Sequence, residues 1–154
     1  MKKLEFIVYG EPKGKGRPRF KRMGNFVTTY TDKDTEIYEN KVLMAYKEQL
    51  KNNYGTFYDN QLMFPKGTLV ELEITCVFPL SKADYGKKGL NKSGRTKLDK
   101  YFCDKKPDID NIIKSIQDGL NGVAYSDDSQ VVKISAMKIY SETPPRVEII
   151  IREL

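Results

Sequence analysis

The sequence contains no histidine, and it has only two cysteines, Cys76 and Cys103. Without histidine, the chain cannot form a Ser-His-Asp or Cys-His nucleophile system, a His-ligated zinc site or a histidine general base. Two cysteines make no disulfide framework. If the protein is an enzyme, its acids, bases and metal ligands must come mainly from Asp, Glu, Lys and Tyr. A site made only of carboxylates favours hard cations such as Mg²⁺ or Mn²⁺.

Long hydrophobic runs are also missing. No segment reaches the roughly 20 apolar residues that a transmembrane helix needs. The N-terminal run from Met1 to Tyr9 is too short and too charged for a signal peptide. We therefore expect a cytoplasmic protein with no membrane partner. Its 154 residues, of which 39% are hydrophobic, fit one domain over 1–154 with a proper buried core.

Negative charge is in the minority, with 21 Asp and Glu against 27 Lys and Arg and a net charge of +6. This excess favours an anionic partner, although simple solubility explains many basic proteins equally well. The cations gather in two glycine-containing segments without apolar periodicity, 11–23 and 82–106, which we expect to be exposed loops. Such loops suit a phosphate backbone, and we favour an anchoring role for their aromatic side chains over base stacking. The candidate DNA-binding residues are Lys13, Lys15, Arg17, Arg19, Lys21 and Arg22.

The apolar pattern predicts an α/β (α+β) domain. Residues alternate as in strands over 4–8, 70–78, 131–140 and 146–152, and Thr143-Pro144-Pro145 predicts a hairpin between the last two. Apolar residues at helical spacing predict a helix over 33–53, capped by Thr31 or Asp32, and a second over 110–120, stopped near Gly122. The expected architecture is a single compact domain, a mixed β-sheet with two main helices.

The most informative stretch runs from Lys106 to Lys114. Pro107 holds the residue before it extended, so a helix cannot begin earlier. Asp108 and Asp110 lie two residues apart in extended chain just before the helix, and their side chains therefore point to the same side. Two neighbouring carboxylates repel each other, and a cation between them relieves the repulsion. Lys114 lies one helical turn after Asp110 and can reach the same cluster.

A second acidic element, Asp127-Asp128, precedes the third predicted strand. The second helix is about 16 Å long, and the seven residues that follow it can span at most about 23 Å. The chain can therefore return along the helix and bring Asp128 beside the first two aspartates. Each residue also has a structural alternative: a helix cap for Asp110 or Asn111, a turn for Asp127-Asp128, and a surface ion pair for Lys114 with Asp118.

The run KPDIDNIIKSIQDGLNGVAYSDDSQVV, from Lys106 to Val132, resembles the signature of the RusA family of Holliday junction resolvases. That family carries Asp-x-Asp-Asn-x-x-Lys, a helix that ends near Asp-Ala-Leu, a short turn, and then Asp-Asp-x-Gln-Val. Gly119 stands where alanine is usual, and we expect this exchange of one small residue for another to be neutral. Residues 14–20, GKGRPRF, with Tyr30-Thr31 and Tyr38-Glu39, are similar to a Gram-positive and phage branch of the family.

The resemblance implies a RusA-like fold and a homodimer that binds four-way DNA junctions and nicks two strands symmetrically in recombination and repair. It assigns metal binding to Asp108, Asp110 and Asp128 and a catalytic role to Lys114, and it leaves the role of Asp127 open. The cofactor it implies is Mg²⁺, with Mn²⁺ as a substitute. Twofold symmetry matches the two equivalent strands of a junction, and the helix over 33–53 is one candidate for the dimer surface.

These assignments agree with the chemistry of phosphodiester hydrolysis. A bound metal activates water and polarises the phosphate, and a lysine stabilises the developing charge. Two other functions fit the same residues: a metal-dependent nuclease that cuts flaps or forks, and a non-enzymatic DNA-binding protein. A nucleotide-binding enzyme is disfavoured, because Gly14-Lys15-Gly16 lacks the spacing of a phosphate loop and no GK[ST] motif follows.

Overall fold

A computed structural model describes residues 1–80 and 102–154. Its main sheet has four strands in the order β1-β6-β4-β5, namely β1 (Lys3–Tyr9), β6 (Arg146–Glu153), β4 (Val70–Pro79) and β5 (Val131–Ser141). β6 pairs antiparallel with β1 and β4, whereas β4 and β5 are parallel. The sheet is therefore mixed, as predicted, and the connection between the parallel strands contains the helix α2 (Ile109–Leu120).

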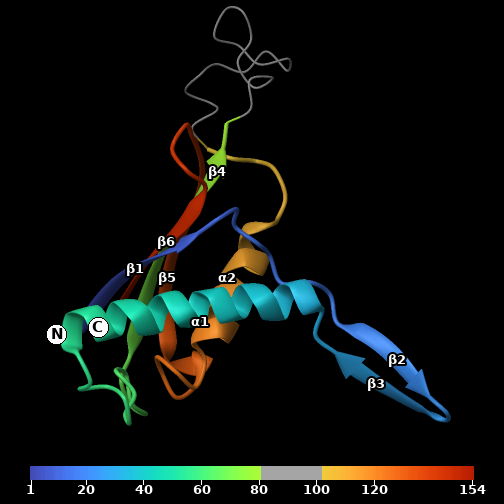
Figure 1. Ribbon diagram of the computed structural model, residues 1–154, viewed down its shortest axis with the longest axis horizontal. Coiled ribbons are helices and arrows are strands. Elements are labelled where there is room, and N and C mark those ends of the chain that lie inside the picture. The colour runs from blue at the N-terminus through green and yellow to red at the C-terminus, as the bar shows by residue number, and fades with distance from the viewer. Residues whose placement is uncertain (81–101) are drawn as a thin grey trace, which may run out of the picture.

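The two helices, α1 (Lys33–Tyr54) and α2, pack on the same face of the sheet (Figure 1). Alternate residues of β4 point to this face, because successive side chains of a strand point to opposite sides. The predicted apolar stripes of the helices meet them in one buried core. Its central members are Leu72, Ile74 and Cys76 of β4, Tyr38, Val42 and Tyr46 of α1, and Ile112, Ile116 and Leu120 of α2.

The helices approach each other closely at Gly119 of α2. A Cβ atom added there would lie 2.9 Å from the backbone oxygen of Glu39 and 3.1 Å from the Cβ of Val42. Glu39 and Val42 belong to α1, and a backbone oxygen cannot move aside without moving its helix. These contacts argue against the expectation that glycine and alanine are interchangeable here. The missing side chain sets how near α2, which carries the candidate site, lies to α1.

The predicted hairpin between the last two strands is also wrong. β5 and β6 follow each other in sequence, but β4 lies between them in the sheet. β4 is the strand buried on both faces, with Val77 only 1% exposed although it points away from the helices. A central position suits such a strand, since two neighbours satisfy its backbone and cover its side chains. Thr143-Pro144-Pro145 correctly marks the chain reversal but does not determine which strand becomes the neighbour.

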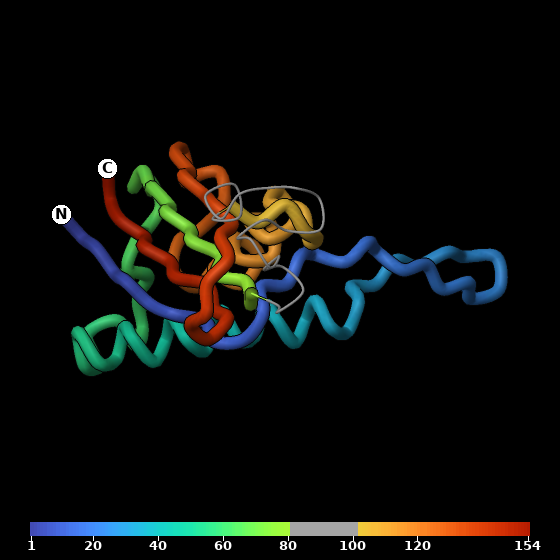
Figure 2. Tube along the Cα trace, turned by 90° about the horizontal axis from the view of Figure 1, so that it is seen from above, coloured from blue at the N-terminus to red at the C-terminus, as the bar shows by residue number. Residues whose placement is uncertain are grey.

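The first basic segment is not a loop throughout. β2 (Arg19–Met23) pairs antiparallel with β3 (Phe26–Tyr30) in a separate two-stranded sheet. We name residues 19–30 the arm, which projects beyond the N-terminal end of α1 and away from the rest of the protein (Figures 1 and 2). Its turn is Gly24-Asn25, with Gly24 at a φ of 62°. A Gly-Asn pair between two strand-forming runs is a hairpin signal, which the interpretation as a basic loop overlooked.

Of the second basic segment, residues 82–101 lie outside the described residues. Phe102 forms a bridge with Ile139 of β5, and the backbone N–H of Cys103 donates to the carbonyl of Lys138 at 2.8 Å. Both cysteines of the chain are buried and free. In residues 1–80 and 102–154, no helix is long and apolar enough to cross a membrane.

Candidate active site

The N-terminus of α2 presents two aspartates. Asp108 occupies the cap position with an extended backbone, at φ −65° and ψ 145°, but its side chain makes no capping hydrogen bond. Asp110 lies in the first turn, one residue after the observed helix start, and it is exposed. No ion pair or hydrogen bond to the Asp110 side chain occurs in the described ranges. The alternative in which Asp110 or Asn111 is the helix cap is therefore wrong, and neither carboxylate is engaged in capping.

Asp108 has a lysine partner that the sequence analysis missed. The ammonium nitrogen of Lys106 lies 2.6 and 2.7 Å from the two carboxylate oxygens of Asp108. This hydrogen bond holds the pKa of Asp108 below its ordinary value. Both side chains are exposed, so solvent screens the pair and its contribution to stability is small. The i, i+2 spacing across Pro107 was the available signal, since such side chains share one side of an extended chain.

The chain after α2 returns and brings Asp128 to Lys114. The ammonium nitrogen of Lys114 lies 3.3 Å from a carboxylate oxygen of Asp128 and 3.3 Å from one of Asp118. These two carboxylates, Asp118 first, raise the pKa of Lys114. The prediction that the chain after α2 can run back along the helix is therefore confirmed to this extent: Asp128 reaches Lys114. The surface pair of Lys114 with Asp118 is present as well, so that alternative is confirmed, and the catalytic role of Lys114 stays a prediction.

The turn that carries Asp128 is held by its neighbours. Asp127 caps the short 3-10 helix η2 (Asp128–Gln130), and its carboxylate accepts the backbone N–H of Ser129 at 2.9 Å. The side-chain oxygen of Gln130 accepts the N–H of Asp127 at 3.2 Å, which completes a capping box. The amide nitrogen of Gln130 donates to two carbonyls of the 64–68 loop, each at 2.9 Å. Asp127 therefore caps the turn, and Gln130 ties the turn to the body of the protein.

Residues 13–16, which we name the strap, lie across α2 beside these aspartates. The backbone N–H of Lys15 donates to the carbonyl of Asn111 at 2.9 Å. The hydroxyl oxygen of Ser115 lies 3.0 Å from the carbonyl oxygen of Lys13 and 2.8 Å from that of Ile112, so its one proton can be donated to either. The strap can lie this close because Gly14 has no side chain, whose Cβ would be 2.9 Å from that of Pro107. Gly14 thus lets the strap lie close to the start of α2 rather than supply flexibility.

The six predicted DNA-binding residues differ in availability. Lys15 pairs with Asp118, and both side chains are partly buried. Arg19 lies 2.8 Å from a carboxylate oxygen of Asp32, at the root of the arm. In the described parts of the chain, the other four form no ion pair and are exposed: Lys13, Arg17, Lys21 and Arg22. These four are the better candidates for contacts with phosphate.

Comparison with known proteins decides the family. Over residues 9–152, the chain matches the family model described as Endodeoxyribonuclease RusA. The chain belongs to the RusA family. It is also 31% identical over 151 residues to the Uncharacterized protein YqaN of Bacillus subtilis (strain 168). The matched region covers 98% of this chain and 96% of that protein. The resemblance based on residues 106–132 is confirmed, and the Bacillus relative fits the Gram-positive branch. As a RusA-family endodeoxyribonuclease, the protein is an enzyme that hydrolyses phosphodiester bonds.

The family's predicted metal ligands do not gather at one point in this structure. Across the described ranges, no group of three Asp, Glu or Cys residues lies close enough together to hold a metal ion. Two of the predicted ligands contact lysines, Asp108 with Lys106 and Asp128 with Lys114. The assignment of a metal to Asp108, Asp110 and Asp128 therefore stays a prediction.

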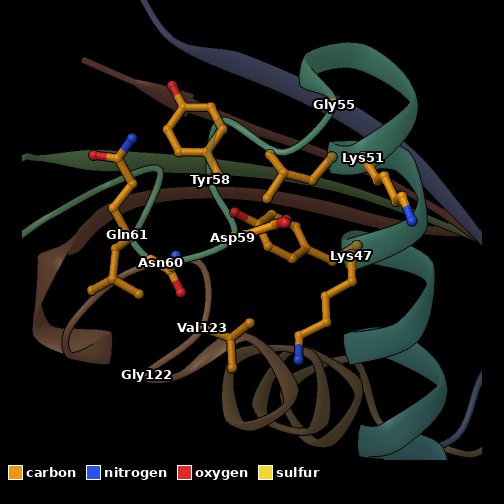
Figure 3. Close-up of a pocket in the computed structure, with 12 residues that line it drawn as sticks. Lys47, Lys51, Gly55, Tyr58, Asp59, Asn60, Gln61, Gly122 and Val123 are labelled. Atoms are coloured by element: carbon orange, nitrogen blue, oxygen red, sulfur yellow. The ribbon is translucent and has the colours of Figure 1, made fainter.

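A groove beside the RusA signature is lined by three lysines and one acidic residue, Glu11. It has a volume of about 560 Å³ and runs between the strap, the end of β4 and residues 105–107, with Lys13, Lys105 and Lys106 in its lining. A second cavity of about 540 Å³ lies at the C-terminal half of α1, between Lys47, Lys51, the 55–62 loop and Val123 (Figure 3). None of the predicted catalytic residues lines this second cavity. The basic groove is therefore the one that suits a phosphate backbone next to Asp108.

Proposed function

We propose that this protein is a divalent-metal-dependent Holliday junction resolvase that acts as a homodimer and makes paired symmetric nicks. One observation carries the proposal: Asp108 and Asp110 begin α2, and Lys114 on the next turn lies against Asp128 from the returning chain. RusA-family nucleases act on branched DNA and generally depend on a divalent metal. The proposal places that chemistry at the N-terminal half of α2.

Asp108, Asp110 and Asp128 would hold Mg²⁺, for which Mn²⁺ is a substitute. The donors fit this ion chemically, since Mg²⁺ takes carboxylate oxygens together with water and phosphate oxygens. The two carboxylates that have partners contact lysines with flexible side chains, 48% exposed at Lys114 and 82% at Lys106, which can turn away from them. When bound, the ion supplies Lewis acidity and lowers the pKa of a water molecule.

Lys114 supplies a fixed positive charge for the transition state. It is anchored by Asp118, one turn further along its own helix, at 3.3 Å. A cation held in place before the reaction needs no reorganisation as charge develops on the phosphoryl oxygens. Lys13 and Lys106, which line the basic groove, bind the DNA backbone next to the site.

A homodimer supplies the two sites that paired nicks require. We propose α1 as the dimer surface, because two apolar side chains on it are exposed two helical turns apart, Ile37 at 52% and Met44 at 63%. The variant Ile37→Glu should sediment as a monomer, bind DNA and make nicks that are no longer paired. An unchanged dimer mass would reject α1 as the interface.

The experiment that tests the function is cleavage of a substrate panel by the purified protein. End-labelled four-way junctions, flaps, forks and linear duplexes of matched sequence are incubated with Mg²⁺ or with EDTA. We expect paired symmetric nicks in the four-way junction only, and only with Mg²⁺. Preferential cutting of flaps or forks would reject the resolvase assignment. Equal binding in EDTA with no cutting under Mg²⁺ or Mn²⁺ would favour a non-enzymatic DNA-binding protein.

A further inference from the structure

The arm has no structural partner in the described part of the protein. Each residue from Arg19 to Tyr30 is exposed, and β2 and β3 pair only with each other. Its polar anchor is the ion pair between Arg19 and Asp32 at its root. The arm therefore adds little to the core, and its surface is available to a binding partner.

Apolar side chains are concentrated on this exposed hairpin. The exposed fractions are 71% for Phe20, 59% for Met23, 77% for Phe26, 63% for Val27 and 49% for Tyr30. Such an apolar patch on a projecting element marks a contact surface, because removing apolar side chains from water is favourable and only a partner can bury them here. Met23 and Phe26 lie directly opposite each other beside the Gly24-Asn25 turn. Opposite residues share one face of a hairpin, so the tip presents a paired methionine and phenylalanine.

The charge of the arm favours nucleic acid over a second protein copy. Arg19, Lys21 and Arg22 alternate with the apolar residues, and the sequence has no acidic residue between Glu11 and Asp32. Two arms of the same positive charge repel each other, whereas a phosphate backbone attracts both. The major groove of DNA admits a two-stranded ribbon, and apolar side chains such as Phe and Met can enter between base steps.

The strap connects the arm to the start of α2. The strap joins α2 through Lys15 and Asn111, and the next glycine, Gly16, donates its backbone N–H to the hydroxyl of Thr35 at 2.8 Å. From Gly16, the seven residues to Met23 extend at most about 23 Å at ~3.3 Å per residue. At 3.4 Å per base pair, this reach corresponds to about seven base pairs, so the tip can contact the same DNA as the strap.

We propose that the arm recognises the branch point, with its cations on the phosphates and its Met23–Phe26 tip inserted into the base stack there. This inference rests on the proposed function, since it takes branched DNA as the substrate. Unstacking costs least where bases are already poorly stacked, so the tip enters a junction more readily than a continuous duplex. The arm thus distinguishes branched from linear DNA, while the α2 site carries out the hydrolysis.

A fluorescent base at the branch point tests this proposal. A four-way junction and a matched duplex carry 2-aminopurine, whose fluorescence rises on unstacking, and the full chain is added in EDTA so that no cutting occurs. The wild-type protein should raise the fluorescence of the junction and not of the duplex. The variant Met23→Ser/Phe26→Ser should lose that rise. Its affinity for the junction should fall about five- to hundredfold, the range that base–aromatic stacking supplies, with duplex affinity unchanged.

The control variant is Phe57→Ser, which removes an equally exposed phenylalanine, 66% against 77%, from a loop outside the arm. It should keep both the fluorescence rise and the preference for the junction. The proposal is overturned if the tip variant gives the wild-type rise, if the wild-type protein binds without a rise, or if the tip variant converts a dimer to a monomer. A tip-dependent rise without cutting in Mg²⁺ would reject the proposed nuclease function and leave the arm's role intact.

Discussion

The ammonium nitrogen of Lys114 lies 3.3 Å from a carboxylate oxygen of Asp128, fourteen residues further along the chain. The contact joins the first half of α2 to the turn that precedes β5. It exists because the chain reverses after α2 and because the Asp127–Gln130 capping box fixes the turn. The two ends of the RusA signature, α2 and the Asp127-Asp128 turn, lie side by side because of this reversal.

The first prediction concerns the charge of Lys114. Lys114→Met should lower single-turnover cleavage of a junction by about 10²- to 10³-fold, the effect of removing one preorganised donor to a developing oxyanion. Lys114→Arg, which keeps the charge with a different shape, should lose less. Binding in EDTA should change little in either variant. The control Lys47→Met removes a lysine from the cavity at the other end of α1. Wild-type cleavage by Lys114→Met would contradict the assigned role.

The second prediction concerns Gln130, which acts on the site only through the turn. Gln130→Ala removes the hydrogen bonds to the 64–68 loop and to Asp127. The free energy of unfolding should fall by about 1–3 kcal/mol, and cleavage should fall as Asp128 loses its position. Gln130→Glu keeps the acceptor oxygen but sets a carboxylate oxygen against two carbonyl oxygens of the 64–68 loop, so its stability should fall at least as far as that of Gln130→Ala. Equal kcat values for all three proteins in denaturant-free buffer would show that the turn does not position the site.

The third prediction concerns the four exposed cations of the first basic segment. Replacing them with glutamine should weaken DNA binding and flatten its salt dependence, by ~0.9 in the slope of log K against log salt for each phosphate that the protein no longer neutralises. The variant changes Lys13, Arg17, Lys21 and Arg22. Binding isotherms between 50 and 200 mM salt, roughly the range in which such ionic interactions act, measure the slope.

The matched control for that variant removes four cations from elsewhere: Lys2, Lys47, Lys51 and Lys66. It lowers the net charge equally, so it separates a local contact from a general effect of charge. The expected slope is that of the wild-type protein. If both variants flatten the slope to the same extent, the first basic segment is not the principal DNA contact.

The fourth prediction concerns the crossing of the helices. Gly119→Ala adds a Cβ atom 2.9 Å from the backbone oxygen of Glu39. Helix propensity favours alanine by up to about 1 kcal/mol, but overpacking costs about 1–3 kcal/mol. We therefore expect a net loss of stability and a lower Tm. A Tm above that of the wild-type protein would show that α1 can shift at no cost.

Local patterns predicted most elements of the fold but not their neighbours. The strands and helices follow from apolar spacing, and the observed α1 and α2 agree with the predicted ranges within one or two residues. The place of β4 between β5 and β6 depends on which strand buries the most apolar surface when it has a neighbour on each side. That requires comparing all the strands, and the sequence of one segment does not contain this information. The arm was missed for a different reason: its charges suggested a loop, although Gly24-Asn25 marked a hairpin.

The candidate site was predictable where chain length limits the geometry. The return of Asp128 toward α2 followed from the length of the helix and of the segment after it. The pairing of Lys106 with Asp108, and of Lys15 with Asp118, could not be derived in this way, because several lysines were within reach of each acid. The close contact of α2 with α1 at Gly119 depends on the distance between the two helix axes. The spacing of residues in the sequence gives no information about that distance.

The most direct test of the metal site compares Asp110→Asn with the wild-type protein on one four-way junction in Mg²⁺. Asp34→Asn is the matched control, because Asp34 lies in the first turn of α1 as Asp110 lies in that of α2. With protein in excess, so that every junction is bound, we expect Asp110→Asn to bind normally and to cut at least about a hundredfold more slowly, because the variant loses a residue that holds the metal. Cutting at the wild-type rate by Asp110→Asn would contradict the account.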